Sequence, residues 1–142
     1  MKKVSFQETV ERIVQEHPRF DGQVYYFLRE ALDFTIKLFE KPVDGPARHV
    51  SGGELLDGIR KFALQEFGPL TMTVLNRWGI KCCEDFGEIV FLMVEKGVLG
   101  KTDEDRKEDF SGGYDFDTVF RKPFRPTQKT SLAPSVDSLP SR

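Results

Sequence analysis

Apolar residues recur three and four positions apart along most of the chain, which is the spacing of a helix with one buried face. Most runs end close to a Pro or a Gly, the residues that commonly stop helices. The pattern therefore predicts five helices. They cover approximately residues 6–17, 22–41, 52–67, 70–78 and 86–96.

Two of these helices begin with the same type of start signal. Residues 5–8 read SFQE and residues 51–54 read SGGE. In a capping box, the Ser side chain accepts a hydrogen bond from the backbone of the Glu, and the Glu side chain accepts one from the backbone of the Ser. We therefore expect Ser5 and Ser51 to cap the first and third helices.

The helices predict a mainly α fold, with a single compact helical domain of about five helices at residues 1–122 and a short C-terminal extended segment. Tyr114, Phe116 and Phe120 should pack this segment onto the body. A β-hairpin at 98–117 would instead make the domain winged-helix-like. The expected core consists of Val10, Ile13, Phe27, Leu28, Leu32, Leu55, Ile59, Phe62, Leu75, Trp78, Phe86, Ile89, Val90 and Met93.

Composition and charge change near the C-terminal end of this domain. Residues 123–142 are rich in Pro and Ser and poor in large apolar side chains, so we predict a disordered tail. Residues 121–142 hold five basic residues and one acidic residue, whereas the remaining 120 residues hold 16 basic and 22 acidic ones. The chain therefore combines an acidic body of net charge −6 with a basic tail of net charge +4.

The sequence also favours a cytoplasmic protein. No apolar run approaches the ~20 residues of a membrane-spanning helix, and the N-terminus lacks the apolar core of a secretory signal. The two cysteines, Cys82 and Cys83, are adjacent and too few for a disulfide scaffold. We expect a reducing compartment and no membrane partner.

The order of the fifth helix and the charged segment after it raises the possibility of a DNA-reading helix with its wing. A recognition helix must present basic and polar groups to DNA. Residues 84–96 carry four carboxylates and one lysine: Glu84, Asp85, Glu88, Glu95 and Lys96. Because phosphate attraction dominates DNA affinity, we predict that this helix does not read duplex DNA.

A possible anion-binding site lies at the start of the third helix. Its residues are Arg48, Ser51, Gly52, Gly53 and Arg60. Free amides at a helix start attract anions, but neither common phosphate-loop motif is present. Plain capping by Ser51 is the alternative, and an enzyme acting on a small anion here is the least favoured function.

The beginning of the tail is a second candidate site. Phe124 lies among Arg121, Lys122 and Arg125. Basic residues interleaved with an aromatic suit RNA or an acidic protein surface. The alternatives are a solubilising tail without a role and a tail that lies on its own acidic body.

Metal and catalytic sites have little support in the sequence. His17, His49 and the two cysteines do not show zinc-ligand spacing, and no nucleophile motif is present. A cysteine near a helix start could have a lowered thiol pKa, but no His is close in sequence. We predict no catalytic residue, no metal and no cofactor.

Several stretches occur in a fixed order: RHVSGGELLDGIRKFALQEFG, WGI at 78–80, EDFGEIVF, and GYDFDTVF followed by RKPFRP. In this series, over about residues 20–126, the chain resembles a family of short bacterial proteins that has no assigned function. The resemblance implies a complete small bacterial protein and supplies no catalytic residue, substrate or cofactor. Cys82 and Cys83 lie outside the shared pattern, which argues against an essential cysteine.

These observations favour a non-enzymatic binding or adaptor module that acts through protein contacts, with an unknown protein partner or with a second copy. Surplus apolar positions on the second and fifth helices suit an exposed patch: Tyr25, Tyr26, Phe34, Phe91 and Leu92. The alternative is a nucleic-acid or ribosome-associated protein that uses the basic tail, with Arg48 and Arg60 as helpers.

Overall fold

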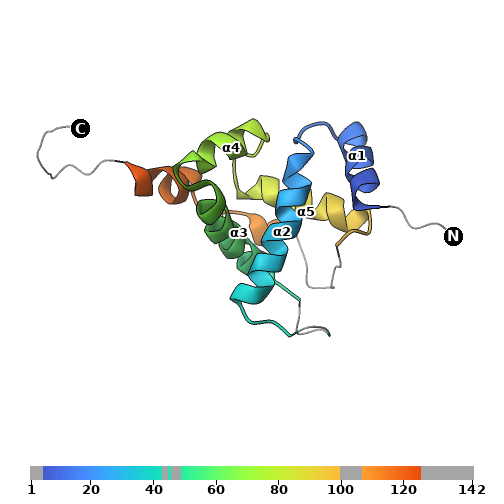
Figure 1. Cartoon of the computed structure of the whole chain (residues 1–142), viewed down its shortest axis with the longest axis horizontal. Coiled ribbons are helices and arrows are strands. Elements are labelled where there is room, and N and C mark those ends of the chain that lie inside the picture. The colour runs from blue at the N-terminus through green and yellow to red at the C-terminus, as the bar shows by residue number, and fades with distance from the viewer. Residues whose placement is uncertain (1–4, 43–44, 46–48, 100–106, 126–142) are drawn as a thin grey trace, which may run out of the picture.

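The computed structural model describes residues 5–42, 45, 49–99 and 107–125. Within these residues the fold is mainly α, as predicted, and the α-helices number five (Figure 1). They are α1 (Phe6–Glu16), α2 (Gln23–Leu38), α3 (Gly52–Phe67), α4 (Thr71–Arg77) and α5 (Cys83–Glu95). In the described part of the chain, no helix is long and apolar enough to cross a membrane.

Both predicted capping boxes are confirmed. Ser5 Oγ accepts from the backbone N–H of Glu8 at 3.1 Å, and Glu8 Oε1 accepts from the backbone N–H of Ser5 at 3.0 Å. Ser51 and Glu54 exchange the same pair of bonds at 3.1 and 3.0 Å. These caps satisfy backbone donors that have no partner within the helix.

Two helix boundaries differ from the prediction. α2 ends at Leu38 rather than near Lys41, because Glu40 adopts a left-handed φ of 54°. The N–H of Glu40 bonds to Lys37 O and that of Lys41 to Ile36 O, which is the Schellman pattern of helix ends. α5 begins at Cys83, three residues before Phe86, the first apolar residue that marks this helix in the sequence.

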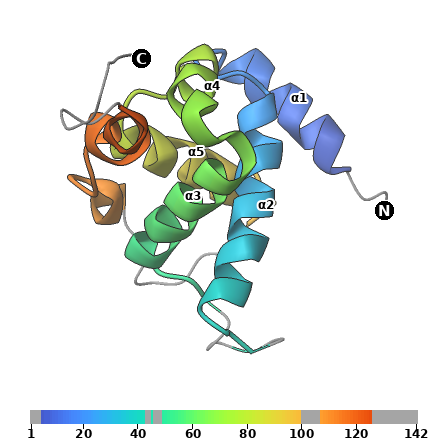
Figure 2. The same cartoon turned by 60° about the vertical axis from the view of Figure 1, so that its left-hand side comes forward.

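α2 and α3 lie side by side, and α5 crosses behind them (Figures 1 and 2). Gly58 of α3 permits the close approach of α2. A Cβ at this position would overlap Thr35 Oγ1 and would lie 2.7 Å from Thr35 Cβ. The Thr35 hydroxyl is buried and donates to Ala31 O at 2.7 Å, so it is satisfied within α2.

The segment after α5 closes the core with short helical turns. These turns are η3 (Lys107–Phe110), η4 (Asp117–Arg121, a π-helix) and η5 (Lys122–Phe124). Residues 100–106 of the possible winged-helix hairpin lie outside the described residues, and the described residues of 98–117 contain no strand. Phe116 and Phe120 are buried and Tyr114 is partly buried, as predicted for the residues that dock this segment.

The predicted core is largely confirmed. Leu32, Trp78 and Val90 are only partly buried, and the other predicted core residues are buried. Phe110 and Phe120 complete the core from the C-terminal segment, with Phe110 packed against Gly87 of α5. A Cβ on Gly87 would lie 3.0 Å from the Phe110 ring, so the glycine leaves room for it.

Candidate functional site

The N-terminus of α3 uses its own side chains to satisfy its backbone. Besides the capping box, Lys41 Nζ contacts Glu54 Oε1 at 3.1 Å. The hydrogen bond from the Ser51 backbone and the nearby Lys41 ammonium hold the pKa of Glu54 below its usual value. A negative charge from within the chain therefore already lies at this helix start.

The other anion-site candidates do not gather around this helix start. Gly52 is buried, and a Cβ on it would lie 2.7 Å from Asp109 Cβ. Gly53 is exposed, and Arg48 lies outside the described residues. Arg60 is nine residues after Ser51, about 13 Å along the helix, and its guanidinium contacts Asp57 Oδ1 at 2.7 Å. This geometry favours capping over recognition of an external anion.

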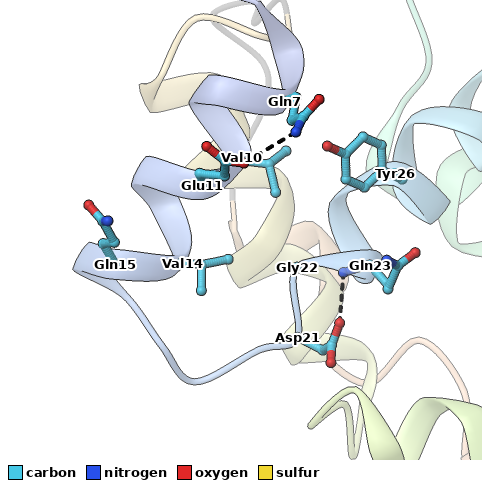
Figure 3. A pocket seen from close by; sticks show the side chains of 9 residues that line it. All are labelled: Gln7, Val10, Glu11, Val14, Gln15, Asp21, Gly22, Gln23 and Tyr26. Atoms are coloured by element: carbon cyan, nitrogen blue, oxygen red, sulfur yellow. Dashed lines mark hydrogen bonds between the residues drawn. The ribbon is translucent and has the colours of Figure 1, made fainter.

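A groove of about 420 Å³ lies between α1 and the start of α2 (Figure 3). It is lined by Gln7, Val10, Glu11, Val14, Gln15, Asp21, Gly22, Gln23 and Tyr26. Gln7 Nε2 donates to Glu11 Oε2 at 3.3 Å, and Asp21 Oδ1 accepts from the backbone N–H of Gln23 at 2.8 Å. The described lining residues offer two carboxylates and no basic group, so the groove suits a cation better than an anion.

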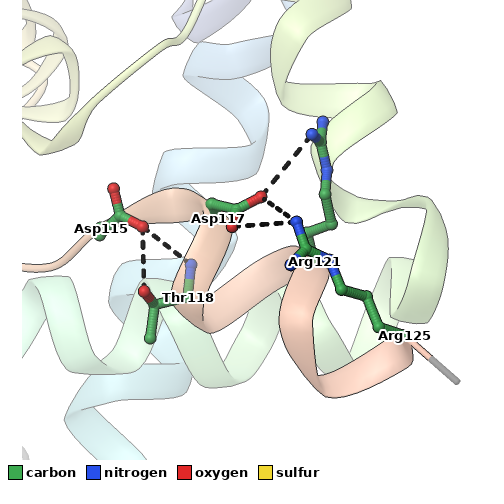
Figure 4. A network of polar contacts seen from close by, with 5 residues as sticks. All are labelled: Asp115, Asp117, Thr118, Arg121 and Arg125. Carbon is green, nitrogen blue, oxygen red and sulfur yellow. Dashed lines mark hydrogen bonds and ion pairs between the residues drawn. The ribbon is translucent and has the colours of Figure 1, made fainter. Parts of the chain in front are cut away.

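The candidate residues at 121–125 lie together on the surface in η4 and η5. Arg121, Lys122, Phe124 and Arg125 are all exposed. Both guanidinium groups converge on Asp117, as Figure 4 shows. Arg125 Nη2 lies 3.2 Å from each carboxylate oxygen of Asp117, and Arg121 Nη1 lies 3.7 Å from Oδ1.

A second carboxylate stands beside this cluster and has a different partner. Asp115 Oδ2 accepts from the backbone N–H and the hydroxyl of Thr118, both at 3.0 Å (Figure 4). These hydrogen bonds hold the pKa of Asp115 below its usual value. Asp115 therefore supports the start of the turn, whereas Asp117 is the carboxylate that both guanidinium groups contact.

Large apolar side chains are exposed on the neighbouring segments. Leu70 is 62 % exposed and Phe124 is 44 % exposed. Leu70 ends the 3-10 turn η2 (Gly68–Leu70), and this turn packs against η4, immediately before the turn that carries Phe124. We call Leu70, Arg121, Lys122, Phe124 and Arg125 the basic–apolar surface.

The sequence interpretation missed two members of this region, Leu70 and Asp117. Asp117 lies four residues before Arg121, which is the spacing of an ion pair on a helix. This spacing could have predicted their contact from the sequence. The fourth helix predicted from the sequence, residues 70–78, begins with Leu70. In the structure that helix begins one residue later, at Thr71, and Leu70 faces solvent.

The apolar patch predicted on the second and fifth helices is not present as an exposed surface. Tyr25 and Leu92 are buried. Tyr26, Phe34 and Phe91 are partly buried and pack against the core. α2 and α5 carry apolar residues on several sides because other parts of the fold cover those sides, as is usual for central helices.

The cysteines lack the environment of reactive thiols. Cys83 is buried, and its Sγ donates to Tyr114 O at 3.5 Å. Burial raises the pKa of Cys83 to about 11, and partial burial also raises the pKa of Cys82. The possibility that the helix start lowers a thiol pKa is therefore wrong, since desolvation and the nearby carboxylates oppose the thiolate.

α5 is packed into the body along much of its length. Its buried residues include Phe86, Ile89 and Met93, and η3 covers part of it. Asp85 is also buried, and it accepts from Lys81 N at 2.7 Å and from Arg19 Nη2 at 2.5 Å. Among the described residues, no three His, Cys, Asp or Glu side chains gather as metal ligands.

Comparison with known proteins adds no relative to these observations. No protein-family model, curated protein or solved structure matches the chain. The geometry of the chain itself therefore carries the functional argument.

Proposed function

We propose that this chain is a non-enzymatic binding module that acts through protein contacts made by the basic–apolar surface. The observation that carries the proposal is the exposure of Leu70 and Phe124 on adjoining segments, next to exposed arginines. Aromatic and Arg side chains are enriched where proteins meet, and they supply much of the binding energy there. A cytoplasmic setting is part of the proposal, and the free thiols of Cys82 and Cys83 support it.

The charges around this surface favour a protein over a nucleic acid. Asp115 and Asp117 lie beside the cations, and residues 1–120 carry a net charge of −6. A long run of phosphates would meet these carboxylates wherever it left the short basic stretch. A protein partner can instead place one acidic group at the arginines and apolar groups at Leu70 and Phe124.

The test is co-purification of partners with the tagged full chain from its host. A Leu70→Ser/Phe124→Ser variant removes the exposed apolar side chains. Leu38→Ser/Phe39→Ser is the matched control, because Leu38 and Phe39 are each 38 % exposed at the far end of α2. Circular dichroism should show that both variants are folded.

The proposal requires that specific proteins are retained by the wild-type chain and the control variant and lost from the Leu70→Ser/Phe124→Ser variant. The same proteins retained by all three chains would overturn it. Retention of RNA instead of protein, abolished by nuclease treatment, would favour the nucleic-acid alternative and would equally overturn it.

A further inference from the structure

The arrangement of charges at residues 117–125 indicates the chemistry of the partner. Two guanidinium groups, from Arg121 and Arg125, meet at one carboxylate. Arg is the side chain best suited to bind a planar carboxylate through two donors. Here a single carboxylate of the same chain, that of Asp117, occupies the position between them.

This intramolecular pairing is only partly satisfied. The Arg121 contact is 3.7 Å long, and the Arg121 and Arg125 side chains remain 53 % exposed. Lys122, the first residue of η5, adds a third exposed cation to the same short stretch of chain. A further carboxylate can therefore bind here at little cost in desolvation, and it can replace Asp117.

The exposed apolar side chains of Leu70 and Phe124 further restrict the chemical class of the partner. Leu70 is 62 % exposed, compared with 44 % for Phe124 and 38 % for Leu38 and Phe39. An inorganic anion would leave Leu70 and Phe124 in water. A peptide segment with an acidic residue beside a Leu or Phe side chain satisfies the arginines and covers the apolar groups together.

We infer that the basic–apolar surface binds a peptide segment of a partner protein that carries both acidic and apolar residues. Before the partner binds, the Asp117 carboxylate occupies the position between Arg121 and Arg125 that a carboxylate of the partner takes in the complex. This inference rests on the proposed function. The Asp117 carboxylate then competes with the partner's carboxylate for Arg121 and Arg125, so removing the charge of Asp117 strengthens partner binding. The π-helical turn η4 places Asp117 and Arg121 on one side of the turn, and η5 returns Arg125 to the same carboxylate (Figure 4).

The experiment is fluorescence anisotropy with the full chain and a fluorescein-labelled peptide that alternates Asp or Glu with Leu or Phe. A second peptide carries Asn or Gln in place of each acid. Asp117→Asn removes the competing carboxylate. Asp115→Asn is the matched control, since it removes the same charge nearby, and Asn can still accept from the Thr118 backbone.

The acidic peptide should bind more tightly than its amide counterpart. Asp117→Asn should bind the acidic peptide about two- to five-fold more tightly than wild type, the range expected for one exposed ion pair. Asp115→Asn should change binding by a smaller factor. Arg121→Gln/Arg125→Gln should abolish the preference for acidic over amide peptide. The comparison of the two Asn variants does not depend on that double variant remaining folded.

Equal binding of the acidic and amide peptides would overturn the inference, and so would equal effects of Asp117→Asn and Asp115→Asn. Tighter binding of a single-stranded oligouridylate than of the acidic peptide would also overturn it. These outcomes leave the proposed function standing if Leu70→Ser/Phe124→Ser still loses its protein partners. If that variant keeps them, the proposed function itself fails.

Discussion

Replacing Gly58 by Ala should destabilise the domain, although the same change stabilises most helices. The new Cβ would overlap Thr35 Oγ1 and lie 2.7 Å from Thr35 Cβ and 2.9 Å from its Cγ2. Thr35 is fully buried and its hydroxyl is bound to Ala31 O. To accommodate the new Cβ, Thr35 must rotate and lose that bond, and the remaining close contact with Thr35 Cβ pushes α2 and α3 apart.

The size of the expected destabilisation follows from one stabilising effect and two destabilising ones. Ala gains about 1 kcal/mol over Gly in a helix interior. Overpacking a tight contact costs about 1–3 kcal/mol, and losing the Thr35 hydrogen bond costs about 0.5–1.5 kcal/mol. The steric and hydrogen-bond costs exceed the gain in helix propensity, and we expect a net loss of about 2 kcal/mol in the free energy of unfolding.

Urea unfolding followed by far-UV circular dichroism measures this loss. Gly53→Ala is the control on the same helix, because a Cβ there has nothing within 4 Å. It should not destabilise the domain. Thr35→Ala removes Oγ1 and Cγ2, so it should partly rescue Gly58→Ala, with a coupling energy of about 0.5 kcal/mol or more. A Gly58→Ala variant as stable as wild type, or one strictly additive with Thr35→Ala, would refute the reasoning.

Three further predictions concern a helix end, a cap and the thiols. Glu40→Gly should stabilise the domain by about 0.5–1 kcal/mol, since it relieves the left-handed strain; a Glu40→Ala variant that gains as much in thermal unfolding would contradict this. The depressed pKa of Glu54 stabilises the fold above the carboxyl's unfolded pKa, and this stability is lost as pH falls through the folded pKa. Glu54→Gln should therefore show a flatter decline in acid unfolding midpoints than wild type. Iodoacetamide at neutral pH should leave Cys83 unmodified in the native chain and alkylate it in denaturant, as mass spectrometry would show; rapid native labelling would contradict its burial.

Local signals predicted the two capped helix starts and two of the helix ends, because these signals need no tertiary information. Ser5 and Ser51 cap their helices at the expected residues. Gly79 and Gly97 have positive φ and follow α4 and α5, as the sequence indicated. Glu40 holds the equivalent position after α2, and a Glu gives no sequence signal for a left-handed conformation.

The features that depend on packing were harder to predict. The N-cap residue of α5 is Cys82, and its side chain makes no capping hydrogen bond. The Asp85 carboxylate, in the first turn of the helix, instead accepts a hydrogen bond from the Lys81 backbone N–H just before the helix. Tyr25 and Leu92 belong to the core because neighbouring elements cover them. At the candidate site, the basic residues 121–125 were found from composition. Their pairing with Asp117 and their proximity to the turn of Leu70 required the fold.

The closure of the core by Phe110, Phe116 and Phe120 has a consequence for how the protein is made. A nascent chain grows at about 5–20 residues per second, and α1 to α5 are synthesised before these rings. Until they arrive, the surfaces of α3 and α5 that pack against them have no cover. During synthesis, the nascent helical body therefore exposes an apolar surface to chaperones and to other nascent chains until Phe110, Phe116 and Phe120 have been added.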